Sequence, residues 1–337
     1  CFFSLQGYAF ERCLWDEGWR FALHKGNSPH QKSFDDSGWR LLNLPHDWAI
    51  EDDFYAQNPS GATGGALPGG IGWYRKHLTL HDNDATSRYV LHFDGAYMNT
   101  SLYVNGKLVG TRPYGFISFS FDLTPYLNKQ GDNVVAVKVD NSEQPNSRWY
   151  TGCGIYRHVY LMKSTDIRVA QWGVQAIPEV KKGVAKLTLN TQIENPSGRN
   201  RKVTVRQKLW NKAHQLVAQT TKTLNVEALG ATVTQQMRAQ KPQLWSLASP
   251  YLYTVTTEIV ENGRVLDTET TTIGFRTIAF DVEKGFFLNG ENIKLNGVCL
   301  HGDLGCLGAA VNEDALHRQL IMMKEMGANA IRCSHNP

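Results

Sequence analysis

The chain has 337 residues, which at about 150 residues per domain indicates two or three domains. Hydrophobic residues make up 42% of the chain and charged residues 20%, a composition that excludes an intrinsically disordered protein. Lysine and arginine number 35 against 31 aspartate and glutamate residues, and no basic run would track a phosphate backbone, so we expect no nucleic-acid partner.

The first nine residues (CFFSLQGYA) are expected to be the remnant of a secretory signal peptide. A cleavage site at Gly7-Tyr8-Ala9 would precede a charged segment that contains tryptophan. Two alternatives stay open: Phe2 and Phe3 begin an edge strand, or Cys1 carries a lipid. No apolar run reaches the roughly 18 residues of a membrane span. The six cysteines are scattered and do not fix the compartment.

Short strands separated by turns fill residues 10–163, which we assign to a first domain. The clearest pair is Thr100–Val104 and Lys107–Thr111, because Asn105-Gly106 between them is a strong hairpin signal. Further strands are expected at 89–93, 116–121, 133–140 and 155–162. Strands at this spacing, with no helical period, predict an antiparallel sandwich of the jelly-roll type.

A second all-β domain is expected at residues 164–280. Alternating apolar residues mark strands around 187–193 and 203–209, with Asn195-Pro196-Ser197-Gly198 as the turn between them. Two more strands, Tyr253–Val260 and Arg264–Ile273, meet at Asn262-Gly263. About seven strands in roughly 110 residues predict an immunoglobulin-like sandwich, without the Cys, Trp, Cys spacing of antibody domains.

The periodicity changes in residues 281–337, which we assign to a third segment. A hairpin is expected at Asn289-Gly290, between strands at 286–288 and 293–295, followed by a buried strand at 297–301. Asn312 is expected to cap a helix whose first turn is acidic and which stops at Gly327. A strand at 330–333 then completes a βαβ unit, which requires parallel pairing and a right-handed crossover.

This βαβ unit is too short to close a barrel by itself. A (β/α)8 barrel needs about 250 residues. We therefore expect the native chain to continue beyond Pro337, since one βαβ unit alone exposes a strand edge and one helix face.

Six motifs occur in the order in which one enzyme family carries them. They are Asn43-Leu44-Pro45-His46-Asp47-Trp48, Gly72-Trp73-Tyr74-Arg75, Gly154-Ile155-Tyr156-Arg157, Gly274-Phe275-Arg276, Leu295-Asn296-Gly297-Val298 and Arg332-Cys333-Ser334-His335-Asn336-Pro337. Together with the domain order, they resemble the amino-terminal part of a family 2 glycoside hydrolase, most closely the bacterial β-galactosidases.

The resemblance implies an exo-acting, retaining β-galactosidase, and therefore a glycoside or oligosaccharide substrate. Retaining hydrolysis needs two carboxyl groups roughly 5 to 5.5 Å apart. In this family both are glutamates at the ends of later barrel strands, beyond Pro337, so we expect this chain to hold no catalytic residue and to be inactive alone. Asp303 and Glu313 match no catalytic position of the family.

The resemblance also implies residues that contact the sugar. His301 and His335 are expected to border the pocket of the terminal sugar, because active sites form at the carboxyl ends of barrel strands. Arg332 resembles the arginine that keeps the nucleophile ionised. Arg148 belongs to a loop that narrows the pocket in this family. Local packing and hydrogen bonding is the alternative interpretation for His301, His335 and Arg332.

Other residues near the pocket carry weaker implications. Trp149 is equally suited to stacking on a sugar ring and to packing under the next strand. Asp47 is expected to cap a turn rather than to bind a ligand. Gly302 stands where the family suggests His or Glu, and Cys306 where a small residue is usual, which leaves the shape of the sugar site open.

A zinc site is the main rival interpretation of the third segment. Period two puts Cys299 and His301 on one face of a strand, and Cys333 and His335 on one face of its neighbour, with Cys306 near. No cofactor is evident otherwise. Some family members bind Mg²⁺ or Na⁺, but the sequence shows no complete set of oxygen ligands.

The predicted protein is thus mainly β, with a jelly-roll sandwich, an immunoglobulin-like sandwich and the first βαβ unit of a (β/α)8 barrel. A β-glucuronidase or β-mannosidase of the same family, and a non-catalytic carbohydrate-binding or structural protein, are the alternative functions. A homo-oligomer is compatible with the sequence. A possible signal peptide and an oligosaccharide substrate favour a periplasmic or secreted location.

Overall fold

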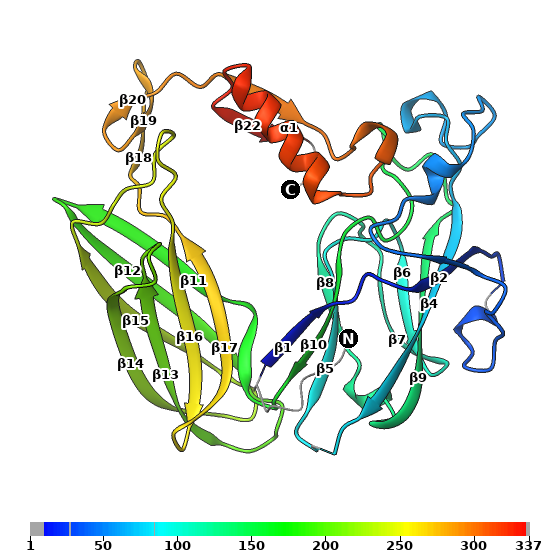
Figure 1. Ribbon diagram of the computed structural model, residues 1–337, viewed down its shortest axis with the longest axis horizontal. Coiled ribbons are helices and arrows are strands. Elements are labelled where there is room, and N and C mark those ends of the chain that lie inside the picture. The colour runs from blue at the N-terminus through cyan, green and yellow to red at the C-terminus, as the bar shows by residue number, and fades with distance from the viewer. Residues whose placement is uncertain (1–9, 27, 84, 335–337) are drawn as a thin grey trace. The chain divides into compact units, whose positions relative to one another are not determined.

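A computed structural model describes residues 10–26, 28–83 and 85–334 (Figure 1). The expected signal remnant at residues 1–9 lies outside the described residues. Two compact units make up the chain: residues 12–162 and the segment from Gly297 onward form one, and residues 163–296 belong to the other. Among the residues that the structure describes, no helix is long and apolar enough to cross a membrane.

The first unit contains the predicted jelly-roll sandwich, with one six-stranded and one four-stranded sheet. The larger sheet has the order β3 (Arg40–Leu42), β2 (Trp19–Leu23), β4 (Gly70–His81), β9 (Gln130–Asn141), β6 (Thr100–Val104), β7 (Lys107–Arg112). The smaller sheet has the order β1 (Phe10–Leu14), β10 (Val159–Ser164), β5 (Arg88–Phe93), β8 (Phe119–Asp122). Side chains from both sheets, such as Trp19, Leu91 and Val137, share one apolar core.

Local turn chemistry accounts for the hairpin between β6 and β7. Asn105 and Gly106 both have positive φ, 50° and 83°, as a type I′ turn requires. Two strand predictions were displaced. The strand expected at 116–121 is β8 at Phe119–Asp122, and the one expected at 155–162 is β10 at Val159–Ser164. The backbone just before β10 bonds elsewhere, since Ile155 O accepts from His46 N and Tyr156 O from Val311 N.

Short 3-10 helices lie between the strands of the jelly roll, and one more lies between β21 (Gly297–Leu300) and α1 (Glu313–Glu325). They are η1 (Ser28–His30), η2 (Trp48–Glu51), η3 (Ala62–Gly64), η4 (Thr124–Tyr126) and η5 (Gly305–Leu307). The loop between η2 and β4 is long and rich in glycine, and it includes η3.

The second unit contains the predicted immunoglobulin-like sandwich. Its three-stranded sheet has the order β11 (Arg168–Lys181), β12 (Val184–Glu194), β15 (Ala231–Gln240). Its four-stranded sheet has the order β14 (Leu216–Val226), β13 (Arg201–Trp210), β16 (Tyr253–Glu261), β17 (Arg264–Ile273). The turn at 195–198 therefore leads from one sheet to the other, whereas Asn262-Gly263 closes the predicted hairpin between β16 and β17.

A small sheet follows, with the order β18 (Ile278–Asp281), β19 (Gly285–Leu288), β20 (Glu291–Asn292). The turn at Asn289-Gly290 is where we predicted it, but its second strand is Glu291–Asn292 and not 293–295. Ile293 leaves the strand while its N–H still donates to Phe286 O.

The predicted βαβ unit is present in the last part of the chain. Strands β21 (Gly297–Leu300) and β22 (Ala330–Cys333) pair in parallel, joined through helix α1 (Glu313–Glu325). Asn312 caps α1 as predicted, with its side chain accepting a hydrogen bond from Ala315 N at 2.9 Å. The expectation of a buried β21 was wrong, since its residues are exposed or half-buried. Among the described residues, only strand β22 pairs with it.

Candidate functional site

Two of the sequence motifs pack against each other in the core of the jelly roll. The Trp48 ring lies directly over Gly72 of β4, where an added Cβ would come within 2.8 Å of Cη2 of the tryptophan ring. The Tyr74 hydroxyl lies 2.8 Å from His46 Nδ1. Burial lowers the pKa of His46, which favours the neutral imidazole. These motif residues therefore form a packed scaffold.

The arginine of the second motif has a structural partner. Arg75 is fully buried, and its Nε donates to Asp36 Oδ2 at 2.7 Å. Its other guanidinium nitrogens donate to the backbone oxygens of Pro29, Gln31 and Phe34. A buried cation is tolerated when it is paired and its donors are used, so Arg75 holds the loop before β3 against β4.

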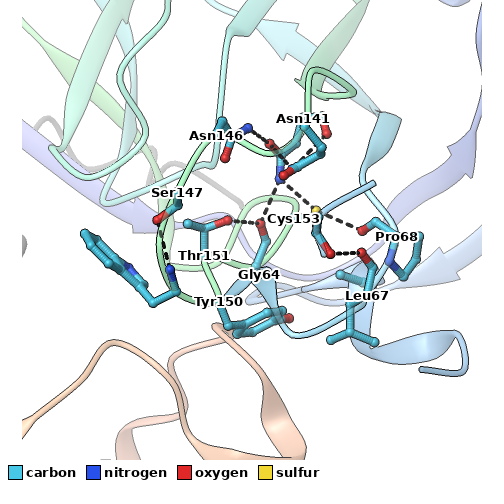
Figure 2. Close-up of a pocket in the computed structure, with 14 residues that line it drawn as sticks. Gly64, Leu67, Pro68, Asn141, Asn146, Ser147, Tyr150, Thr151 and Cys153 are labelled. Carbon is cyan, nitrogen blue, oxygen red and sulfur yellow. Dashed lines mark hydrogen bonds between the residues drawn. The ribbon is translucent and has the colours of Figure 1, made fainter. Parts of the chain in front are cut away.

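A network of amide side chains shapes the loop after β9 (Figure 2). Asn141 is buried; its Nδ2 donates to Gly152 O at 3.2 Å and to Cys153 Sγ at 3.0 Å. Its Oδ1 accepts from the side chains of Gln144 and Asn146 at 2.9 and 2.7 Å. Burial raises the pKa of the Cys153 thiol to about 12, so this sulfur stays protonated. The network thus fixes both ends of the segment that carries Arg148 and Trp149.

Arg148 and Trp149 differ in what they contact. Arg148 is exposed, and it does not line the large pocket, a cavity of about 410 Å³ beside this loop. Trp149 is half-buried and lines both that pocket and the small one beneath the loop. Its backbone N–H donates to Ser147 Oγ at 3.4 Å. Both interpretations of Trp149 therefore stay predictions.

A pocket of about 410 Å³ lies beside this loop, within the first unit. One wall comes from the jelly roll and includes Phe116, Trp149 and Tyr156. The other comes from the end of β21, helix α1 and the end of β22, and includes His301, Gln319 and Ser334. Its size and its mixture of aromatic and polar residues suit a small polar ligand with an apolar face.

The sequence-predicted site residues are only partly brought together. His301 is exposed and lines the large pocket, next to Gly302. Arg332 is also exposed, and one of its terminal nitrogens lies 3.3 Å from Ser334 Oγ and 3.7 Å from Cys299 Sγ. The Arg332 guanidinium lowers the pKa of Cys299. His335 lies outside the described residues.

The register of the parallel pair contradicts the geometry of the zinc interpretation. Cys299 pairs with Arg332, and Leu300 pairs with Cys333, so the two cysteines point to opposite faces of the pair. The interpretation failed because period two determines the faces of one strand but not the alignment of its neighbour. In the described ranges, no three His, Cys, Asp or Glu residues gather in a way that would hold a metal ion.

Asp47 caps a turn, as predicted, but it does more than that. Its Oδ1 accepts from Ala49 N in the first turn of η2, at 3.1 Å, and from Cys153 N at 2.9 Å. Its Oδ2 accepts from the Tyr150 hydroxyl and, at 2.8 Å, from Ala309 N. The sequence showed only the local turn, because three of these four donors are distant in the chain.

Three family models match consecutive parts of the chain. The model for the sugar binding domain of glycosyl hydrolases family 2 matches residues 15–165, the one described as glycosyl hydrolases family 2 matches 167–276, and the TIM barrel domain model matches 280–337. The chain belongs to glycosyl hydrolase family 2. The resemblance seen in the motifs is thereby confirmed, as is the mainly β fold class.

Relatives in glycosyl hydrolase family 2 match nearly the whole chain. A β-galactosidase of Bacteroides ovatus, BoGH2A, is 51% identical over 97% of this chain and 39% of its own length. A crystal structure of a family 2 member from Bacteroides cellulosilyticus matches with a TM-score of 0.92 at 36% identity, over 97% of this chain and 43% of that one. A β-glucuronidase structure from Bacteroides uniformis matches with a TM-score of 0.86 at 30% identity, over 97% and 40%.

This family 2 chain therefore spans less than half the length of these relatives. Its large pocket lies where the parts matched by two of the family models meet, since Trp149 falls in the sugar binding domain match and His301 in the TIM barrel match. His301 follows the carboxyl end of β21, and both fall in the TIM barrel match.

Proposed function

We propose that this chain is the amino-terminal part of a retaining exo-β-galactosidase. The observation that carries the proposal is the 51% identity to a β-galactosidase of Bacteroides ovatus over 97% of the chain. The pocket between Trp149 and His301 supports it, because an indole ring and a hydrogen-bonding imidazole suit the two faces of a terminal sugar.

In the proposed mechanism, this chain binds and orients the sugar. The His301 imidazole donates to or accepts from sugar hydroxyls, while the Trp149 ring packs on the apolar face of the sugar ring. The acid/base and nucleophile glutamates, roughly 5 to 5.5 Å apart in a retaining enzyme, come from later barrel strands. Arg332 would face the nucleophile and keep it ionised by its positive charge.

A β-glucuronidase is the second candidate, because a β-glucuronidase structure matches 97% of the chain with a TM-score of 0.86. The two sugars differ at C4, where the hydroxyl has the opposite configuration, and at C6, where the glucuronide carries a carboxylate. A glucuronidase therefore needs a cation beside that group. We propose a periplasmic or secreted location for either enzyme, because the signal-peptide remnant expected at residues 1–9 and an oligosaccharide substrate both fit an exported protein.

A panel of nitrophenyl glycosides tests the proposal with the protein that carries the complete barrel. We expect kcat/KM on the β-galactoside to exceed that on the β-glucuronide and the β-mannoside by at least about 100-fold, roughly 3 kcal/mol in transition-state binding. A preference for the β-glucuronide would show that the protein is a β-glucuronidase, the second candidate. Failure to hydrolyse any glycoside would favour a non-catalytic carbohydrate-binding protein.

A further inference from the structure

The buried carboxylate of Asp47 joins three segments of the first unit. Asp47 is only 2% exposed. Its carboxylate accepts hydrogen bonds from Ala49 N, Cys153 N, the Tyr150 hydroxyl and Ala309 N. Three of the four donors are backbone N–H groups, whose positions depend on the fold of their segments. A carboxylate with this many donors is well satisfied without a counter-ion.

The contact with the segment after β21 is close because a glycine stands there. Gly308 has φ +58°, and a Cβ added to it would lie 2.5 Å from Ile50 Cγ2 and 2.9 Å from the Tyr150 hydroxyl oxygen. A side chain at this position would therefore push the segment away from Asp47. Gly308 and Ala309 are both buried against the jelly roll as a result.

The segment between His301 and Ala309 is short, and residues 304–308 within it are bonded to one another. Leu304 N donates to Gly308 O at 2.8 Å, and Gly308 N donates to Gly305 O at 2.9 Å. A second tether follows directly, since Val311 N donates to Tyr156 O at 2.9 Å. The pocket edge at His301 and Gly302 is therefore connected to Asp47 through a short, internally bonded loop.

We propose that Asp47 is a positioning residue for the sugar pocket. Its Oδ1 holds the segment of Trp149 through Cys153 N, and its Oδ2 holds the loop that follows His301 through Ala309 N. One carboxylate thus sets the spacing between the two walls of the pocket. This inference rests on the proposed function, because it takes that pocket as the sugar site.

The variant Asp47→Asn tests the inference in the protein that carries the complete barrel. An amide nitrogen donates and does not accept, so whichever oxygen it replaces, two of the four hydrogen bonds to this side chain lose their acceptor. Because loss of sugar contacts weakens ground state and transition state alike, we expect KM to rise about tenfold or more while kcat changes less than about threefold. A KM within twofold of the wild-type value would overturn the proposal.

Asp122→Asn is the matched control. Asp122 Oδ1 accepts from Thr124 N at 2.8 Å, the same bond to the second residue along the chain that Asp47 makes with Ala49. Asp122 is exposed at the end of β8 and does not line the pocket. We expect its KM to be unchanged. An equal rise in KM for both variants would show a general loss of structure and contradict a positioning role.

A second measurement tests the inference even if Asp47→Asn does not fold or the wild type hydrolyses no glycoside. Tyr150→Phe removes only the hydroxyl that donates to Asp47 Oδ2, and with it one of the bonds that fix the carboxylate oxygen to which Ala309 N donates. In the 337-residue chain, we expect amide hydrogens of residues 303–311 to exchange at least about threefold faster in Tyr150→Phe, and unchanged exchange in Asp122→Asn. Unchanged exchange in Tyr150→Phe would refute the tether. If the wild type is inactive while exchange is faster in Tyr150→Phe and unchanged in Asp122→Asn, the proposed function is refuted and the positioning role of Asp47 is retained.

Discussion

Asp267 of β17 is a carboxyl group in the interior of the second unit. The residue is 3% exposed, and its Oδ2 accepts from Val169 N at 2.7 Å. Burial raises the pKa of Asp267 to about 7, against an ordinary value of 3.8. Removing a carboxylate from water disfavours its charged form, and the bond from Val169 offsets this only in part.

This carboxyl group predicts a pH dependence of stability. Between pH 4 and 7 the folded protein retains a proton that the unfolded chain has lost, so the free energy of unfolding falls as pH rises through this window. At 1.36 kcal/mol per pH unit the loss totals about 4 kcal/mol. In urea titrations we expect Asp267→Asn to lack this slope. The control Glu179→Gln, at an exposed position of β11, should keep it. Equal slopes in both variants would refute the assignment.

At the scale of one element, β4 shows why the Gly-Trp-Tyr-Arg motif has its order of residues. Trp73, Tyr74 and Arg75 are all fully buried, so the strand is covered on both faces at this point. Gly72 precedes them because the Trp48 ring occupies the space of a side chain. The motif therefore records close packing of η2 on β4 and does not mark a ligand-binding site.

We expect Gly72→Ala to lower the free energy of unfolding by about 1–3 kcal/mol, as added volume does in a packed core. The control is Gly38→Ala, because an added Cβ there has no atom within 4 Å and Gly38 has no positive φ. Chemical denaturation of both variants measures the difference. A Gly72→Ala protein as stable as the control would show that Trp48 moves aside without cost.

Strand β13 follows the alternating apolar pattern of a sandwich strand except at one buried polar residue, Gln207. Its inward positions alternate as Val203, Val205, Gln207 and Leu209, all buried. Gln207 lies between the two apolar clusters of the sandwich, and its Nε2 donates to Thr191 and Thr257 hydroxyls at 2.9 and 3.1 Å. The buried Gln207 is therefore tolerated among apolar residues because hydroxyl groups from two other strands accept its hydrogen bonds.

At the scale of the whole molecule, the chain carries one βαβ unit of its barrel. Helix α1 has no buried residue, and apolar side chains such as Met322 and Met326 are 54% and 71% exposed. A complete barrel of about 250 residues would cover such surfaces with further strands and helices.

We therefore expect the 337-residue chain alone to hydrolyse no nitrophenyl β-galactoside. The physical reason is that, in the proposed mechanism, the pocket supplies binding groups only, while acid/base and nucleophilic chemistry needs the pair of glutamates of the later strands. Turnover measured against a mock purification checks this. Activity above that background would mean that carboxylates within the chain, such as Asp303 or Glu313, perform the reaction.

Local features were predictable from the sequence by itself. The Asn105-Gly106 hairpin, the Asn312 cap and the two sandwiches depend on turn geometry and on period-two alternation, which act over a few residues. The family followed from motifs in chain order. Arg148 and Arg332 were named by resemblance, yet Arg148 lies outside the large pocket and Arg332 contacts Cys299 and Ser334.

Only the tertiary structure decided which distant groups meet. Asp47 and Ala309 are 262 residues apart in the chain, and no local pattern couples them. Likewise, the register of β21 and β22 places Cys299 beside Arg332 and away from Cys333. Periodicity describes one element at a time, whereas packing and hydrogen bonding between elements select a single alignment. The sequence alone therefore determined the elements and the family, and the fold in space determined the walls of the pocket.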